Sequence, residues 1–127
     1  MVMETEQKIQ NQDMEQGQKI QEPNQEIKIE KRLKLTHRVD DYGEYMYTRI
    51  TIYVNANVTL NQLKFTISRY KTIDAYVNDK PEQIVERVGS LVKDLESEVI
   101  SKAKHVIEID KKVKEYATRE NITLVTE

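Results

Sequence analysis

Three stretches of the chain alternate between apolar and polar residues, the pattern expected of strands in a sheet with one covered face. The clearest of them spans residues 44–54. One of its faces carries Met46, Thr48, Ile50, Ile52 and Val54. The opposite face carries Tyr45, Tyr47, Arg49, Thr51 and Tyr53. We expect the first face to pack on a core and the second, rich in tyrosine, to meet solvent or a ligand.

A second alternating stretch precedes it, at residues 26–38. Its apolar positions are Ile27, Ile29, Leu33 and Leu35. Its other face is basic and carries Lys28, Arg32, Lys34 and Arg38. Residues 40–43 (Asp-Asp-Tyr-Gly) lie between the two stretches and combine acids that bond their own backbone with a glycine that accepts a positive φ. The pattern therefore predicts an antiparallel hairpin.

A third strand is predicted at residues 58–70, after a turn at residues 55–57 (Asn-Ala-Asn). Its inward positions are Leu63, Phe65 and Ile67, and its outward positions are Lys64, Thr66, Ser68 and Tyr70. Val58 and Leu60 fall on the wrong face for this assignment. Either a bulge or a later strand start would reconcile them. Residues 72–78 form either a short fourth strand or a loop.

Near residue 80 the apolar period changes to that of a helix. Asp79 is a candidate cap, Pro81 suits a first helical turn, and Glu82 would complete a capping box. Apolar residues then recur every three or four positions, at Ile84, Val88, Leu91, Leu95, Val99, Ala103 and Val106. The sequence therefore predicts a helix from about residue 80 to 104 or longer.

The course of the chain after Ala103 has two interpretations. The apolar steps continue to about residue 117 without Pro or Gly, and an unbroken helix would span about 55 Å, against about 33 Å for a strand of about ten residues. Either the helix overhangs and pairs with the same helix of a second subunit, giving a homodimer, or it breaks near residues 106–109 and folds back. Residues 122–125 are expected to form a short strand.

Residues 1–25 are rich in glutamine, acidic and poor in apolar residues, so we expect a disordered tail. Residues 26–127 then form one α+β domain. Its predicted architecture is an antiparallel three- to four-stranded meander packed on one or two C-terminal helices.

Several chemistries find no support in the composition. The chain has no cysteine and only three glycines, and neither His37 nor His105 has metal ligands at the usual spacing. We therefore expect no catalysis, metal or cofactor. The N-terminus lacks the features of a signal peptide, and no apolar run approaches the roughly 20 residues that cross a bilayer. We expect a cytoplasmic protein without a membrane partner.

The net charge of −2 hides an uneven distribution, because residues 26–71 carry nine basic residues against five acids while both flanking segments are acidic. A meander gathers these cations and the tyrosines on its outer face, where cations follow phosphates and rings stack on bases. We predict a non-catalytic protein that binds single-stranded DNA or RNA. The predicted contact residues are Lys28, Arg32, Lys34, Arg38, Tyr45, Tyr47, Arg49, Tyr53, Lys64 and Tyr70.

Two alternatives use the same face. Tyr and Arg also anchor protein interfaces, so the chain fits an interaction module such as an inhibitor, adaptor or assembly subunit. Cross-strand pairs of Tyr with Lys, Arg or Thr also stabilise sheets that bind nothing. If the face does bind nucleic acid, we expect the acidic tail to shield it when no ligand is present.

Overall fold

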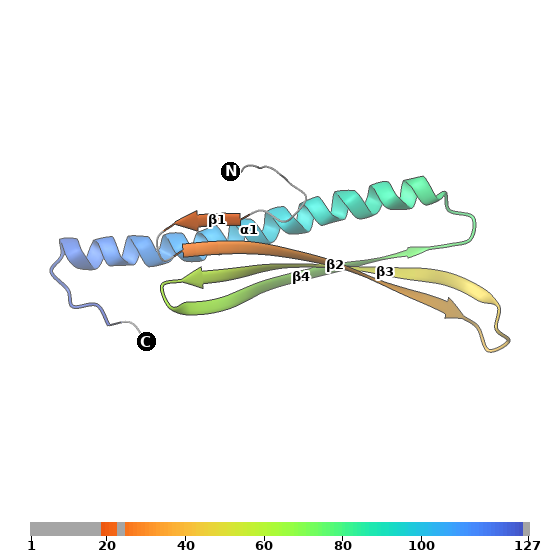
Figure 1. Cartoon of the computed structure of the whole chain (residues 1–127), viewed down its shortest axis with the longest axis horizontal. Helices are drawn as coiled ribbons and strands as arrows, with labels where there is room; N and C mark the ends of the chain where they lie inside the picture. Colours follow the sequence, from red (N-terminus) through yellow and green to blue (C-terminus); the bar gives the residue numbers. More distant parts are fainter. Residues whose placement is uncertain (1–18, 23–24, 126–127) are drawn as a thin grey trace.

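The computed structural model describes residues 19–22 and 25–125 and consists of one antiparallel sheet and one long helix (Figure 1). The strands lie side by side in chain order, β1-β2-β3-β4. The elements are β1 (Lys19–Glu22), β2 (Gln25–Val39), β3 (Tyr45–Leu60), β4 (Leu63–Ala75) and α1 (Pro81–Arg119). This confirms the predicted α+β meander, with four strands and one helix.

The core lies between α1 and one face of β3. Every second residue of β3 is buried there: Ile50, Ile52, Val54, Ala56, Val58 and Leu60. From α1, Leu95, Val99 and Ala103 are at most 2% exposed and complete this cluster. Fully burying a side chain of this size stabilises the fold by about 1.5–3 kcal/mol. The alternation therefore sets which face of the sheet the helix covers.

The helix does not cover β2 along its whole length. Leu33 and Leu35 lie on the helix side, as predicted, but are 58% and 60% exposed. The reason is that α1 packs mainly on β3 and β4 and touches β2 least. The expectation that both leucines belong to the core was therefore wrong.

The turn predicted at residues 55–57 was wrong, because β3 continues through it. Asn57 is a strand residue whose amide donates to Glu30 Oε1 (2.9 Å) and accepts from the Thr66 hydroxyl (2.9 Å). The turn instead lies at Asn61 and Gln62, where Asn61 takes φ 58°, a conformation that asparagine tolerates. Val58 and Leu60 belong to β3 and point to the same buried face as its even-numbered residues 50–56, so no bulge is needed to bury them.

A bulge occurs instead at the other end of β3. Val39 pairs with Tyr45 and Arg38 pairs with Tyr47, so Met46 is the extra residue. An inserted residue reverses the facing of everything beyond it. The hairpin itself is confirmed: the Asp40 carboxylate accepts from the backbone N–H of Tyr42 and of Glu44.

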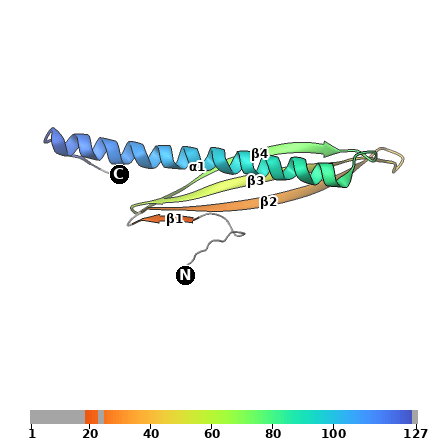
Figure 2. The same cartoon turned by 90° about the horizontal axis from the view of Figure 1, so that it is seen from above.

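Helix α1 is unbroken over 39 residues, or about 58 Å. It begins short of the β2–β3 hairpin and extends past the opposite end of the sheet (Figures 1 and 2). The predicted capping by Asp79 was wrong. The cap residue is Lys80, and the Asp79 carboxylate instead accepts from the Tyr76 backbone N–H (2.7 Å).

The chain after the helix forms a C-terminal cap and no strand. Asn121 takes φ 57°, its N–H donates to Thr118 O (3.3 Å), and the Ile122 N–H donates to Ala117 O (2.8 Å). These bonds satisfy carbonyls that the last helical turn leaves unpaired. The strand predicted at residues 122–125 was therefore wrong.

Most of the predicted tail lies outside the described residues, at 1–18 and 23–24. The part that is described is ordered as strand: Lys19–Glu22 forms β1, which pairs with the start of β2, and Gln25 opens β2.

Candidate nucleic-acid interface

The sheet face opposite α1 is covered by no element of residues 19–22 and 25–125 (Figure 2). Strand parity and register place six cations on this outer face of β2–β4: Lys28, Arg32, Lys34, Arg38, Arg49 and Lys64. They also place three acids there: Glu26, Glu30 and Asp74. The outer face is therefore net positive on a chain whose net charge is negative.

One group on this face, which we call the open cluster, consists of Arg32, Tyr53 and Tyr70. The three residues are cross-strand neighbours on β2, β3 and β4. The Arg32 guanidinium carbon lies 5.1 Å from the Tyr53 ring centroid, and the Tyr53 and Tyr70 rings are 6.1 Å apart at 33°. Tyr70 is 67% exposed. The open cluster thus presents an aromatic platform beside a cation, and its three members include no acid.

A second group, the closed cluster, consists of Arg49, Asp74, Tyr47 and Tyr76. Arg49 holds Asp74 through two hydrogen bonds of 2.9 and 3.1 Å. Its guanidinium also lies 5.5 Å from the Tyr47 ring, which is 5.7 Å from the ring of Tyr76. The planar fork of Arg49 is therefore occupied by a bidentate carboxylate partner.

The electrostatics of the closed cluster follow from this pair. The hydrogen bond to Asp74 and its charge raise the pKa of Arg49. The hydrogen bond from Arg49 is the largest cause that lowers the pKa of Asp74, and the charge of Arg38 lowers it further. Both groups are thus held charged, and Arg49 is less available to an external phosphate than Arg32.

Further cations lie on the outer face outside the two clusters. Lys28 and Lys64 line a hollow of about 350 Å³ together with Asn57, Thr66 and the acid Glu26. Lys34 lies between the open and closed clusters, level with Thr51 and Thr72. The distance from Thr59 to Tyr47 along β3 is about 40 Å at 3.3 Å per residue. The cations and rings are therefore distributed along the strands.

Tyr45 is the one predicted contact residue that does not belong to this face. Because of the bulge at Met46, its side chain turns to the helix side of the sheet. There its hydroxyl lies 2.6 Å from the Thr48 hydroxyl, which is also 2.8 Å from His37 Nδ1. Strict alternation across residues 44–54 was therefore wrong at its first positions.

Sequence reasoning missed Asp74 and Tyr76. A signal was present, because continuing the parity of Lys64 and Tyr70 along the third strand puts Asp74 on the outer face. The sequence left residues 72–78 open between a strand and a loop, so the facing of Asp74 was not predicted. In the structure β4 runs to Ala75, and Asp74 stands opposite Arg49.

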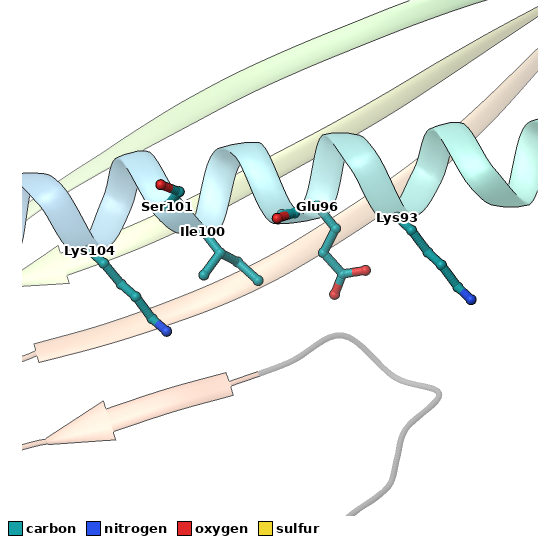
Figure 3. Close-up of a pocket in the computed structure, with 6 residues that line it drawn as sticks. Lys93, Glu96, Ile100, Ser101 and Lys104 are labelled. Carbon is teal, nitrogen blue, oxygen red and sulfur yellow. The ribbon is translucent and has the colours of Figure 1, made fainter.

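Two further hollows lie along the flanks of α1. One, of about 520 Å³, is lined by helix residues alone and faces the side of β2 and β1, where Lys93, Glu96 and Lys104 extend outward (Figure 3). The other, of about 630 Å³, lies on the β4 side and includes His105 and Arg69. Ion pairs border each flank, Lys31 with Glu96 (3.3 Å) and Arg69 with Glu98 (2.8 Å). These pairs fasten the helix to both outer strands of the core.

Within the described ranges, no group of three or more His, Asp or Glu side chains is arranged to hold a metal ion. In that same part of the chain, no helix has a long enough apolar stretch to cross a bilayer. Comparison with known proteins adds no assignment: no protein-family model, no curated protein and no solved structure matches the chain.

Proposed function

We propose that the chain is a non-catalytic, cytoplasmic protein that binds single-stranded DNA or RNA along the outer sheet face. The observation that carries the proposal is the open cluster: an exposed Tyr70 ring, its neighbour Tyr53 and the Arg32 guanidinium lie together on a net positive surface. Among residues 19–22 and 25–125, no carboxylate pairs with Arg32. Stacking of one base on such a ring contributes about 1–3 kcal/mol, and cations along the strands attract the phosphates.

The same chemistry predicts what the protein discriminates. Ring faces stack on every base, and the amide of Asn57 is already bonded to Glu30 and Thr66, so little on the face reads base edges. Duplex DNA hides its base faces inside the stack. We therefore expect a preference for single strands over duplexes with weak dependence on sequence.

The test is a polarisation titration of the full chain with labelled single-stranded DNA, single-stranded RNA and duplex DNA of mixed sequence, at low and at physiological salt. The proposal predicts saturable binding to single strands that weakens as salt rises. Binding to duplex should be clearly weaker at both salt concentrations. A flat titration with single strands in low salt would refute it.

A protein-interaction module is the second candidate, and the closed cluster favours it. Tyr47, Tyr76 and Arg49 are positioned by one another and by Asp74, the kind of preordered surface that protein interfaces use. This candidate predicts that oligonucleotides do not bind while Tyr47→Ala or Arg49→Ala removes a protein partner or changes the oligomeric mass.

We also propose that two copies associate through the end of α1. Toward its C-terminal end, the helix carries Ile109, Val113 and Tyr116 at spacings of four and three, and each is about half exposed. This spacing forms the apolar seam by which two helices pair. A dimer would join two outer faces and lengthen the surface available to one nucleic-acid strand.

Val113→Asp tests this association, because a carboxylate in the seam cannot be buried without a partner. We expect the variant to have the mass of one chain by multi-angle light scattering at a concentration where the unaltered protein is a dimer. Ser101→Asp adds the same charge to an exposed position on the same helix and should leave the dimer intact. Single-chain mass for the unaltered protein would contradict the proposal.

A further inference from the structure

The outer edge of β2 is open over most of its length. Strand β1 pairs with β2 at Gln25–Lys28 only, and within residues 19–22 and 25–125 no strand pairs with this edge from residue 29 to 39. Such an edge presents unpaired backbone donors and acceptors to any extended chain. Beside it, Leu33 and Leu35 are more than half exposed on the helix side. The edge therefore has both the backbone groups and the apolar surface to accept a strand.

The register of β1 determines which residues would come next along this edge. Lys19 stands opposite Lys28, and each step toward the N-terminus on β1 advances one step on β2. Continued without a shift, the pairing sets residue 18 opposite Ile29 and residue 12 opposite Leu35. The pairing of β1 with β2 alone fixes this register. Whether the facing residues match in charge and polarity is therefore a separate observation.

The match is favourable in charge. Residues 12–18 read Gln-Asp-Met-Glu-Gln-Gly-Gln. In this register Glu15 stands opposite Arg32 and Asp13 opposite Lys34, both on the outer face. At Glu30, the one acid on the outer side of β2 between residues 28 and 38, the partner is Gly17, which brings no charge. Opposite charges facing each other across strands stabilise a sheet, and like charges destabilise it.

On the helix side, Met14 stands opposite the exposed Leu33, and the other three partners there are uncharged glutamines at 12, 16 and 18. A second copy of β2 is a poorer occupant of this edge. If it paired antiparallel with the register symmetric about Leu33, Arg32 would face Lys34 and Lys28 would face Arg38, so cations would stand against cations. From register, charge and apolar contact together, we propose that residues 12–18 add to the open edge of β2 as a continuation of β1.

The consequence concerns the open cluster. Arg32 and Lys34 are two of the cations proposed to follow phosphates, and the added strand places a carboxylate beside each. The chain then carries its own competitor for nucleic acid, a regulatory role that rests on the proposed function. The strand addition itself does not, and it is testable without any nucleic acid.

The chain has no cysteine, so an engineered pair gives an unambiguous crosslink. Met14→Cys with Leu33→Cys joins two residues that the proposal makes direct cross-strand partners, with Cβ atoms about 4.5–5.5 Å apart, within reach of a disulfide. Gln18→Cys with Leu33→Cys is the matched control, because four residues of register separate its cysteines by roughly 13 Å.

We expect the in-register pair to form an intramolecular disulfide under mild oxidation at least about tenfold faster than the control pair, measured by intact mass and non-reducing gel. Equal rates for the two pairs would overturn the proposal, and so would crosslinking mainly between chains. Leu33 is exposed, so its substitution is not expected to prevent folding in either variant.

A second comparison tests the competition. Asp13→Lys with Glu15→Lys should raise the affinity of the full chain for single-stranded DNA at low salt. The control is Glu4→Lys with Glu6→Lys, which changes the net charge equally at positions outside the paired register. The affinity of the first variant should exceed that of the control on the order of fivefold. Equal affinities of the two variants would overturn the competition. If no variant binds DNA, the proposed function fails while the crosslink still decides the strand addition.

Discussion

The open and closed clusters use the same side chains on the same sheet face and differ in one acid. In the closed cluster Asp74 lies opposite Arg49 and holds its guanidinium with two hydrogen bonds. In the open cluster the position opposite Tyr53 on β4 is Tyr70, and in the described part of the chain Arg32 has the Tyr53 ring beside it and no carboxylate partner. An arginine and tyrosine surface is therefore available to a ligand only where no carboxylate already occupies the arginine.

The largest expected effect is loss of stacking in the open cluster. Tyr70→Ala should weaken binding of single-stranded DNA by about 5- to 150-fold, corresponding to about 1–3 kcal/mol for one base stack. Tyr70→Phe keeps the ring and should change affinity by less than about twofold. Polarisation titration gives the affinity of the unaltered protein and of both variants.

Tyr76→Ala is the matched control in the closed cluster, because Tyr76 is 54% exposed and thus comparable in exposure with Tyr70. Its loss should alter affinity far less than the loss of Tyr70. Equal losses for Tyr70→Ala and Tyr76→Ala would remove the distinction between the two clusters.

A smaller effect of opposite sign is expected when the closed cluster is opened. Asp74→Asn removes the carboxylate that occupies Arg49, so affinity for single strands should rise a few-fold at low salt while the unfolding temperature falls. Unchanged affinity together with an unchanged unfolding temperature would show that the ion pair neither withholds Arg49 from nucleic acid nor stabilises the fold.

The same variant gives a pH signature. In the folded state the pKa of Asp74 is lowered below its ordinary value of 3.8. At a pH between the lowered and the ordinary pKa, the folded protein therefore binds fewer protons than the unfolded chain. The stability contributed by Asp74 is therefore fully present at a pH above the ordinary pKa. It is lost as the pH falls through the lowered pKa of the folded state. The difference in unfolding temperature between the unaltered protein and Asp74→Asn should hold near neutral pH and shrink in acid, which calorimetry can follow.

The smallest effect separates charge from stacking within the outer face. Lys34→Ala should reduce the slope of log affinity against log salt by about 0.7, the value for one cation released from a single strand. Tyr70→Ala should leave that slope unchanged while lowering affinity at every salt concentration. A slope insensitive to Lys34 would place the nucleic acid elsewhere.

Much of the fold was readable from local pattern. The alternation from Ile50 to Val54 identified the buried face of β3 correctly, and the three- and four-residue steps through Leu95, Val99 and Ala103 identified the face of α1 that meets it. Of the ten predicted contact residues, nine lie on the outer face and Tyr45 does not. The failure at Tyr45 arises because a single extra residue, Met46, reverses parity, and nothing in the local pattern marks where a bulge falls.

The sequence by itself determined the two faces of the sheet and the buried stripe of the helix, because side-chain direction follows from backbone geometry within a few residues. Only the tertiary structure decided that Asp74 meets Arg49, that the turn falls at Asn61 and that the middle of β2 keeps a free edge. These features depend on register and on where elements end, which are settled by competition among pairings between residues far apart in the chain.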